Sequence, residues 1–388
     1  MYPTISDLIN DLTGIYIPLP IQTFGFFLAI SFLCAAWTLS LELKRKEKEG
    51  LLRPVIHKKV KGKPASVTDY AVSATAGFLL GWKLLYVITN YSEFVNDTQG
   101  VILSSKGNVL GGILIAALSA YLRYHESEKN KKEKPVTVEE KIHPYQLVGN
   151  MTVIAAVAGI LGAKIFHNLE NIDELMADPV DALLSFSGLT MYGGLICGAI
   201  AVIWFGNKNN ISWYHLIDSA APGLMLAYGT GRVGCHLSGD GDWGIVNLSA
   251  KPERLSFLPD WMWGFHYPHN VISEGIPIPG CEGRHCMMLP EPVFPTPFYE
   301  AVICISLFFV LWSIRKRISI PGILFSVYLI MNGTERFFIE KIRVNTKYHI
   351  FGNEITQAEI ISVCLFITGI AGLFFFKKRF KSDGKATV

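Results

Sequence analysis

One short segment of the chain concentrates residue types that can do chemistry. Residues 229–244 read GTGRVGCHLSGDGDWG and hold an arginine, a cysteine, a histidine and two aspartates among six glycines. Glycines let backbone N–H groups approach an anion closely, and a guanidinium group binds phosphate through two parallel hydrogen bonds. Because the segment closes an apolar stretch long enough to lie in lipid, we expect a site that handles charge at the mouth of a membrane helix.

Other ionisable residues fall inside apolar stretches, where each costs about 3 kcal/mol at the bilayer centre unless it is paired or faces water. These residues are Asp218, Glu300, Glu335 and Glu340, with Arg232, Arg336 and Arg343 beside them. One interpretation is a set of ion pairs that hold helices together. The other is a polar cavity that opens outward and binds a phospholipid headgroup, since arginine matches phosphate better than lysine does.

The composition is that of an integral membrane protein. Half of the 388 residues are hydrophobic, 17% are charged, and the mean hydropathy is +0.33. We predict an all-α, polytopic fold with nine transmembrane helices, each of about 17 to 23 residues. The predicted spans are residues 18–41, 68–90, 107–123, 146–168, 189–206, 213–231, 297–314, 320–339 and 357–376.

The basic residues predict the orientation. Most of the 35 Lys and Arg fall in four runs, at residues 42–63, 123–141, 315–317 and 377–381, and nine spans place all four on one side. The positive-inside rule makes that side cytoplasmic, with the N-terminus outside and the C-terminus inside. No Lys or Arg precedes Lys44, so we expect the first helix to stay as an anchor. Residues 229–244, 245–295 and 335–356 then lie outside.

The outer loop carries two cysteines, Cys281 and Cys286, in the segment CEGRHC. A disulfide between them would staple this Pro-rich loop. A metal site with His266, His269 or His285 is the alternative, although the spacing matches no standard zinc pattern. The aromatic residues of the loop fit a belt at the membrane interface, and the alternative is a loop that caps the cavity and guides an acceptor; an interfacial cap is favoured.

The chain also contains an internal echo. A shift of 81 residues lays residues 80–97 over residues 161–178, and a further gap of one residue aligns Gly111 with Gly193. The identical positions are Gly81, Lys83, Asn90, Glu93, Asp97, Ser104 and Gly107. Either one helical hairpin duplicates the other, or two membrane hairpins share glycines by composition.

Four blocks resemble the motifs of the prolipoprotein diacylglyceryl transferase family. They are SFSGLTMYGGLICG at 185–198, DSAAPGLMLAYGTGRVGCHLSGDGDWG at 218–244, FPTPFYE at 294–300 and ERFFIEKIR at 335–343. The resemblance covers residues 146–376 and the helix at 18–41, where Phe24 and Gly25 stand in place of a Tyr-Gly pair. We expect one transmembrane domain over residues 1–388, with an extra hairpin at about 68–123 beyond the family's seven helices and an extracytoplasmic insert at 245–296.

The resemblance implies roles for individual residues. It assigns Arg232 and Arg336 to the phosphate of the lipid donor, and Glu340 to a carboxylate one helical turn after Arg336. Asp240 stands where the family signature has Glu. The substrate-binding residues that it implies are Gly193, Gly194, Gly231, Gly234, Gly239, Asp242, Gly244, Phe24, Arg343, Tyr299 and Glu300.

The chain departs from the family at positions that matter for proton transfer. Tyr192 replaces the histidine before Gly-Gly, and Cys235 replaces the signature Asn. An unperturbed tyrosine, with a pKa of about 10, is a poor base at neutral pH. His236 is a second candidate, because its ordinary pKa of about 6.5 suits a base; the alternative is a structural hydrogen bond.

The resemblance implies an enzyme that transfers a diacylglyceryl group from phosphatidylglycerol to the lipobox cysteine of a prolipoprotein signal peptide. The products are a thioether and glycerol phosphate, and no cofactor or metal is expected. It places the chain in a bacterial inner membrane, with the active site facing the extracytoplasmic side. A transferase with another lipid donor or acceptor, and a non-catalytic lipid-binding or transport protein, are the alternatives. No motif indicates nucleic-acid binding.

Overall fold

In the computed structural model the chain is mostly helical. The structure describes residues 1–61, 64–96, 101–102, 104–130, 136–179, 182, 190–350 and 353–383. The chain forms two compact units. The larger comprises Met1–Pro3, Gln22–Val55 and His143–Val388, and the smaller comprises Thr4–Ile21 and Ile56–Ile142. The smaller unit thus contains the hairpin for which the resemblance offers no counterpart.

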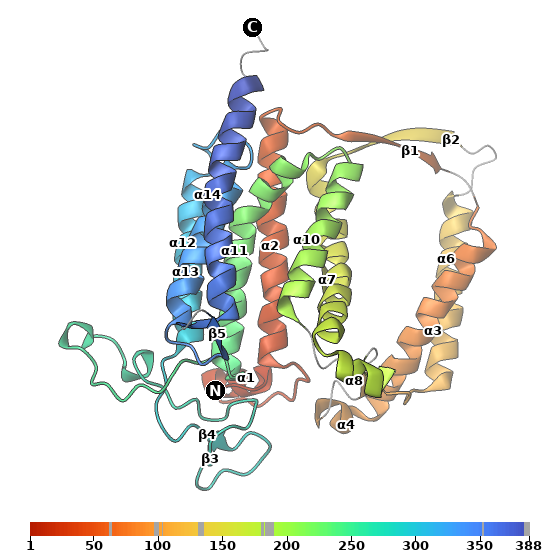
Figure 1. The fold of residues 1–388 in the computed structure, drawn as a ribbon. Coiled ribbons are helices and arrows are strands. Elements are labelled where there is room, and N and C mark those ends of the chain that lie inside the picture. The colour runs from red at the N-terminus through yellow and green to blue at the C-terminus, as the bar shows by residue number, and fades with distance from the viewer. Residues whose placement is uncertain are drawn as a thin grey trace. The chain divides into compact units, whose positions relative to one another are not determined.

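The larger unit is a bundle of long helices around α11 (Figure 1). Its long helices are α2 (Thr23–Lys48), α7 (Val148–Glu170), α10 (Met191–Lys208), α11 (Trp213–Ser238), α12 (Thr296–Ile314), α13 (Ile323–Glu340) and α14 (Gln357–Asp383). Shorter helices are η1 (Pro144–Leu147) and α8 (Ile172–Ala177). Helix α11 packs against α2, α12 and α13, whereas α14 packs on α13 and α7 on α10. Segments far apart in the sequence therefore meet along α11.

Glycines allow α11 to approach its neighbours closely. A Cβ atom on Gly229 would lie 2.8 Å from Ile305 Cγ1 of α12, and one on Gly234 would lie 2.7 Å from Phe27 Cβ of α2. Small residues at such contacts are typical of helix packing in membranes. Arg232 lies between these two glycines on α11, so the close packing fixes the position of its backbone in the bundle.

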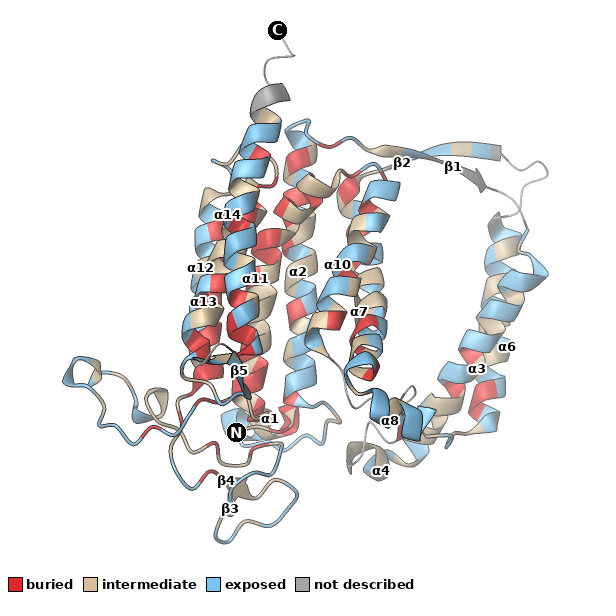
Figure 2. Ribbon diagram, viewed as in Figure 1, coloured by how far each residue is buried: buried red, intermediate tan, exposed pale blue. Residues whose placement is uncertain are grey.

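The burial pattern fits a bundle in lipid. Figure 2 shows buried residues along α11 and mostly exposed residues on α14. The core between α11, α12 and α13 consists of Ala221, Met225, Cys304, Phe308, Leu311 and Leu324. The exposed side chains of α10 and α14 are largely apolar, among them Ile200, Trp204 and Phe374. Lipid tails cover such apolar surfaces, so these surfaces need no protein partner.

A long helix lies at each of the nine predicted spans within the described residues. Five of the described helices are both long and apolar enough to cross a membrane: Thr23–Lys48, Val67–Thr89, Pro144–Glu170, Thr296–Ile314 and Gln357–Phe380. The protein is therefore a multi-pass helical membrane protein. The count of nine spans and the orientation stay predictions.

The segment between α11 and α12 folds into an ordered loop with its own small core of Trp243, Tyr267, Leu289 and Val293. It contains η2 (Glu253–Leu255), η3 (Asp260–Met262), β3 (Ile276–Pro277) and β4 (Met287–Met288). Strands β3 and β4 pair antiparallel, and Cys281 and Cys286 form a disulfide beside them. The disulfide interpretation is therefore confirmed, and the metal alternative is wrong, because oxidised cysteines do not bind a metal as thiolates. After α13, β5 (Lys347–Ile350) and β6 (Asn353–Thr356) form a hairpin.

The smaller unit has a helical hairpin as its main element. Its elements are α1 (Ile5–Thr13), β1 (Val55–Lys61), α3 (Val67–Thr89), α4 (Tyr91–Asn96), α6 (Val109–Asn130) and β2 (Val136–Ile142). Helix α3 begins with a capping box between Ser66 and Asp69. Strands β1 and β2 pair in a two-stranded sheet.

The hairpin α3–α6 is built like α7–α10 in the larger unit. A Cβ atom on Gly81 would lie 2.2 Å from the carbonyl oxygen of Gly111, and one on Gly162 would lie 2.6 Å from that of Gly193. Asn90 Nδ2 donates to Tyr86 O at 3.1 Å, and Asn171 Nδ2 donates to His167 O at 3.0 Å. The 81-residue shift aligns Gly81 with Gly162 and Asn90 with Asn171, and the further gap of one residue aligns Gly111 with Gly193. This agreement favours duplication over shared composition. Asp97 and residues 185–188 of the echo lie outside the described residues.

Candidate active site

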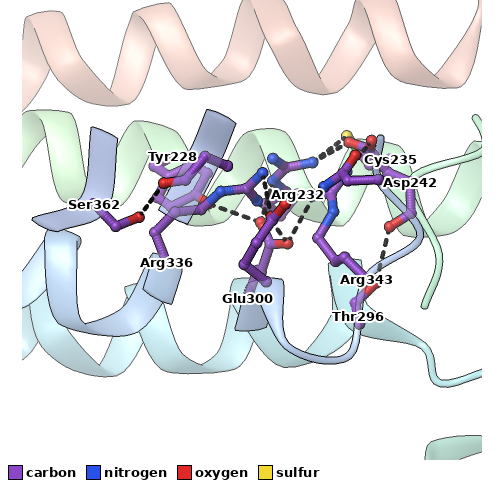
Figure 3. A network of polar contacts seen from close by, with 12 residues as sticks. Tyr228, Arg232, Cys235, Asp242, Thr296, Glu300, Arg336, Arg343 and Ser362 are labelled. Carbon is purple, nitrogen blue, oxygen red and sulfur yellow. Dashed lines mark hydrogen bonds and ion pairs between the residues drawn. The ribbon is translucent and has the colours of Figure 1, made fainter. Parts of the chain in front are cut away.

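Three arginines converge on one carboxylate at the end of α11 (Figure 3). Glu300, in the first turns of α12, has no solvent exposure. Its carboxylate lies 2.5 Å from Arg232 Nε, 3.0 Å from a guanidinium nitrogen of Arg343 and 3.4 Å from one of Arg336. We call Arg232, Arg336, Arg343 and Glu300 the arginine cluster. Its members come from α11, α12, α13 and the segment after α13.

Two further carboxylates bind the outer sides of the arginines. Asp242 accepts hydrogen bonds from both Arg232 and Arg343. Glu340 lies 3.1 Å from a guanidinium nitrogen of Arg336, one helical turn away on α13. The carbonyl oxygen of Asp242 accepts a hydrogen bond from Thr296 Oγ1 at 2.8 Å. Each arginine is thus held between at least two groups, which fixes where its guanidinium plane lies.

The backbone places Arg343 against Asp242. Gly244 and Arg343 form an isolated antiparallel bridge, and Ile245 N donates to Ile342 O at 2.9 Å. A Cβ atom on Gly244 would lie 2.5 Å from Ile342 O, so only glycine permits this approach. Gly239 ends α11 in the left-handed region, at φ +65°, and turns the chain toward Asp240 and Asp242.

Tyr228 supports the cluster from α11. Its hydroxyl donates to Glu300 at 2.8 Å, and its ring lies under the guanidinium group of Arg232, 5.3 Å from Cζ to the ring centroid. Tyr228 precedes Arg232 by four residues, so both side chains lie on one face of α11. A cation over an aromatic face is stabilised by the ring quadrupole.

Some polar atoms in and next to the cluster have no hydrogen-bond partner among the described residues. They include Arg343 Nε and both carboxylate oxygens of Glu335, which is 6% exposed. Buried polar atoms are satisfied in most structures, and an orphaned guanidinium N–H is a donor available to an anion. The site therefore has the donors that a phosphate would accept from.

The two aspartates of the signature differ in acidity. Burial alone would raise the pKa of Asp242, but the Arg232 and Arg343 guanidinium groups lower it below its usual range. Burial raises the pKa of Asp240, and the charge of Asp242 raises it further. Asp242 therefore stays ionised, and Asp240 is the better proton acceptor of the pair.

Ligand atoms of Cys235, Asp240 and Asp242 lie within 4.8 Å of one another, a geometry that could hold a metal ion. Asp242, however, already accepts from two arginines. Their positive charge opposes a divalent cation at the same carboxylate. The donor set does not favour a metal.

The two candidate bases occupy different places. Tyr192, near the start of α10, lies within electrostatic range of Arg232, Arg336 and Glu340. His236 instead lies in an aromatic cage, with its Nδ1 3.1 Å from Tyr267 Oη. The other rings of the cage are Trp261, Phe265 and Phe298. Tyr192 is thus within electrostatic range of the cluster, whereas His236 makes the structural hydrogen bond that was its alternative interpretation.

Several glycines expected to bind substrate lie at helix contacts instead. A Cβ atom on Gly193 would lie 2.4 Å from Phe166 Cβ of α7, and one on Gly194 would lie 3.0 Å from Gly159 O. Gly234 faces α2 in the same way, and Gly231 has only an ordinary contact with Ser31. Phe24 is 39% exposed at the start of α2. Gly193, Gly194 and Gly234 are therefore required for helix packing.

Tyr299 borders an apolar pocket of about 630 Å³ beside the cluster. Its hydroxyl donates to Met262 O at 2.5 Å, which leaves the ring as its contribution to the wall. The lining residues are Lys251, Leu255, Leu258, Met262, Trp263, Phe294, Phe298, Tyr299, Val302, Ile303 and Ile342. A hydrocarbon group fits such a wall.

Sequence reasoning missed Tyr228 and Thr296 as members of the site. The spacing of Tyr228 from Arg232 was the available signal. Asp218 proved structural, because it accepts hydrogen bonds from Gly322 N at 2.7 Å and Phe325 N at 2.9 Å at the start of α13. It caps α13 rather than lining an outer cavity.

Comparison with known proteins matches the chain to one family. The model of a family described as prolipoprotein diacylglyceryl transferase matches residues 114–375. A phosphatidylglycerol–prolipoprotein diacylglyceryl transferase of Corynebacterium diphtheriae is 25% identical over 67% of this chain and 84% of its own length. Proteins with the same description from Clostridium tetani and Vibrio vulnificus are each 28% identical, over 57% and 64% of this chain and 77% and 80% of their own lengths. The matched residues include every member of the arginine cluster.

Proposed function

The chain belongs to the prolipoprotein diacylglyceryl transferase family, and we propose that the arginine cluster is where its reaction takes place. The enzyme transfers a diacylglyceryl group from phosphatidylglycerol to a prolipoprotein. The observation that carries the site assignment is the convergence of three guanidinium groups on the buried carboxylate of Glu300. An apolar pocket beside them suits hydrocarbon.

The cluster binds the phosphate of the lipid donor. Each guanidinium group has five N–H donors, and Glu300, Asp242 and Glu340 occupy only some of them. The carboxylates hold the arginines in place before the lipid arrives, so little reorganisation is needed when charge develops on the leaving phosphate. In a dry site this preorganised charge is the main source of rate acceleration.

The transfer is a substitution at a glyceryl carbon. The thiolate of the acceptor cysteine attacks that carbon, a carbon–sulfur bond forms, and the carbon–oxygen bond to the phosphate breaks. Glycerol phosphate leaves with the bonding electrons, and the arginines stabilise its charge. The thiol proton passes to a base, for which Asp240 is the candidate because of its raised pKa.

Tyr192 has a different role from the base. A phenol stays protonated at neutral pH, so near Arg336 and Glu340 it donates a hydrogen bond to the phosphate rather than accepting a proton. His236 positions the outer loop through Tyr267. These roles divide the three residues: Asp240 takes up the proton, Tyr192 binds the phosphate and His236 supports the loop.

The orientation is part of the proposal. The disulfide Cys281–Cys286 lies in the loop that joins α11 to α12, and disulfides persist in oxidising compartments. Four basic runs belong to the opposite side of the predicted topology. Both observations support an active site on the extracytoplasmic face of a bacterial inner membrane.

Purified full-length enzyme with labelled phosphatidylglycerol and a lipobox peptide tests the proposal. The Arg232→Ala variant should transfer label about 10² to 10³ times more slowly, as expected for one preorganised donor. Arg254→Ala is the matched control, because Arg254 is an exposed arginine of the outer loop, and it should keep the wild-type rate. Equal rates for the two variants would remove the arginine cluster from the reaction.

A further inference from the structure

A polar cavity lies at the end of α11 opposite the arginine cluster. It is bordered by His215, 17 residues before Arg232, which corresponds to about 25 Å along a helix at 1.5 Å per residue. Its volume is about 220 Å³. The lining residues are Arg45, Lys46, Glu49, Leu51, His215, Asp218, Arg315, Lys316, Ile318, Ser319, Pro321 and Leu324. We call it the inner cavity.

The acidic groups at the inner cavity are already occupied. Asp218 caps α13 through two backbone N–H groups, and Glu49 lies 2.7 Å from Arg45. Behind the wall, the buried carboxylate of Glu42 binds Arg45 at 2.8 Å and Arg315 at 2.6 Å. The two arginines are thus neutralised by their own partners.

Lys46 and Lys316 carry positive charge and N–H donors that the acidic groups of the cavity do not occupy. Lys46 is 5% exposed; its ammonium donates to His215 O at 3.0 Å and lies 4.0 Å from Asp218. An ammonium group has three N–H donors, so those contacts leave at least one for a ligand. Lys316 is exposed at the rim and has no ion pair within the described part of the chain. The inner cavity therefore carries a positive surplus.

The buried side chain of His215 is a second observation that points to a ligand in the cavity. Its side chain is 8% exposed, and its Nδ1 has no hydrogen-bond partner among the residues that the structure describes. Its carbonyl oxygen accepts from Lys46 and from Ser219 at 2.7 Å, so the residue is held firmly in place. A buried polar nitrogen that borders a cavity is normally satisfied by a ligand or an ordered water.

We propose that the inner cavity binds the phosphate of an anionic phospholipid headgroup in the leaflet at that end of the bundle. Lys46, His215 and Lys316 hold the phosphate, and Leu51 and Leu324 form the apolar part of the lining. The volume is below the roughly 300 Å³ of small-molecule pockets, so it accepts a headgroup and not the acyl chains. Basic pockets between membrane helices bind lipid headgroups in this way. Inorganic phosphate has the same chemistry, so the test must separate the two sources.

Photocrosslinking of the full-length protein in vesicles tests this assignment. The vesicles contain a zwitterionic lipid and a small fraction of phosphatidylglycerol with a photoreactive group next to the phosphate. Mass spectrometry of the peptides should find label in residues 45–51 and 315–324. Label in residues 228–244 and 335–343 reports separately on the arginine cluster, so the failure of one site is distinguishable from the failure of the other.

Two neighbouring basic residues provide matched variants. Lys316→Gln should lower labelling of the inner peptides about fivefold, the equivalent of about 1 kcal/mol for one basic residue near a charged lipid surface. Arg317→Gln removes the same charge from a residue outside the lining and should leave labelling unchanged. His215→Phe should also lower labelling, and its transfer activity reports whether it has folded.

Three outcomes would overturn the proposal. The first is equal labelling of the two charge variants, and the second is equal labelling by a photoreactive zwitterionic lipid. The third is complete loss of inner labelling on addition of inorganic phosphate, with labelling at the arginine cluster retained, which would assign the cavity to the free ion.

Discussion

Both ends of the larger unit hold arginines around a buried carboxylate, but the two ends differ in the sign of the charge that remains. At one end Glu300 is fully buried among three arginines, and at the other Glu42 is 1% exposed between two. The end with the arginine cluster, which we call the outer end, has two carboxylates beyond those that bind the arginines, Glu335 and Asp240. The end with the inner cavity, which we call the inner end, has a lysine beyond the ion pairs, Lys316. A buried carboxylate fixes the arginines in both places, but only the arginine cluster has a proton acceptor, Asp240, beside the guanidinium groups that would hold a phosphate.

The difference teaches why arginine pairs alone do not identify an active site. A buried ion pair is costly to break whether or not it has a function. At the inner end the arginines Arg45 and Arg315 serve the packing of helix ends. At the outer end a buried N–H of Arg343 has no hydrogen-bond partner within the part of the chain that the structure describes, and a proton acceptor lies close by.

The largest difference between the two ends is expected when the central carboxylate of each is neutralised. Glu300→Gln and Glu42→Gln each leave arginines without their buried counter-charge, and each should lower the free energy of unfolding by about 3 kcal/mol or more. Only Glu300→Gln should also slow transfer, by about 10² to 10³ per folded molecule, because the phosphate-binding arginines lose their positions. Thermal unfolding in detergent and the rate of label transfer measure the two effects. A Glu42→Gln variant that folds and transfers as slowly as Glu300→Gln would erase the distinction between the ends.

A second prediction concerns the surplus carboxylate at the outer end. Asp240→Asn should slow transfer about 100-fold, the lower range for the loss of a general base. A base works only when deprotonated, so the wild-type rate should fall as the pH falls through the raised pKa of Asp240, and the variant should lack that fall. Asp260→Asn changes a 94% exposed aspartate of the same loop and should keep the wild-type pH profile. An unchanged acidic limb in Asp240→Asn would assign the base to another residue.

The smallest effect comes from exchanging arginine for lysine at each end. Arg336→Lys keeps the charge but loses the planar fork that binds Glu300 and Glu340, and transfer should slow about tenfold. Arg315→Lys makes the same exchange beside Glu42 and should leave the transfer rate within about twofold. Initial rates at saturating phosphatidylglycerol are sufficient to measure both. If both variants lost rate equally, the effect would be structural rather than catalytic.

The sequence alone predicted the positions of the long helices and part of the candidate site. Apolar runs located the long helices, because length and hydropathy are local properties. The motif blocks led to the expectation that Arg232 and Arg336 meet, and both bind Glu300 in the structure. The 81-residue echo matched the glycine contacts of the two hairpins.

The remaining features depend on which segments meet, which no local pattern encodes. The cage around His236 comes from residues 261–298, so the sequence left open whether this histidine acts as a base. Gly193 looked like part of a binding turn, but its need for space arises from Phe166 on another helix. Asp218 resembled a functional charge in lipid until α13 supplied the N–H groups that it caps.

The most direct test of the account is a structure of the enzyme with a non-reactive phosphonate analogue of phosphatidylglycerol. The account predicts phosphonate oxygens within about 3.2 Å of guanidinium nitrogens from at least two of Arg232, Arg336 and Arg343, with a hydrocarbon tail in the neighbouring apolar pocket. A phosphonate bound elsewhere, with all three arginines still held only by Glu300, Asp242 and Glu340, would contradict it.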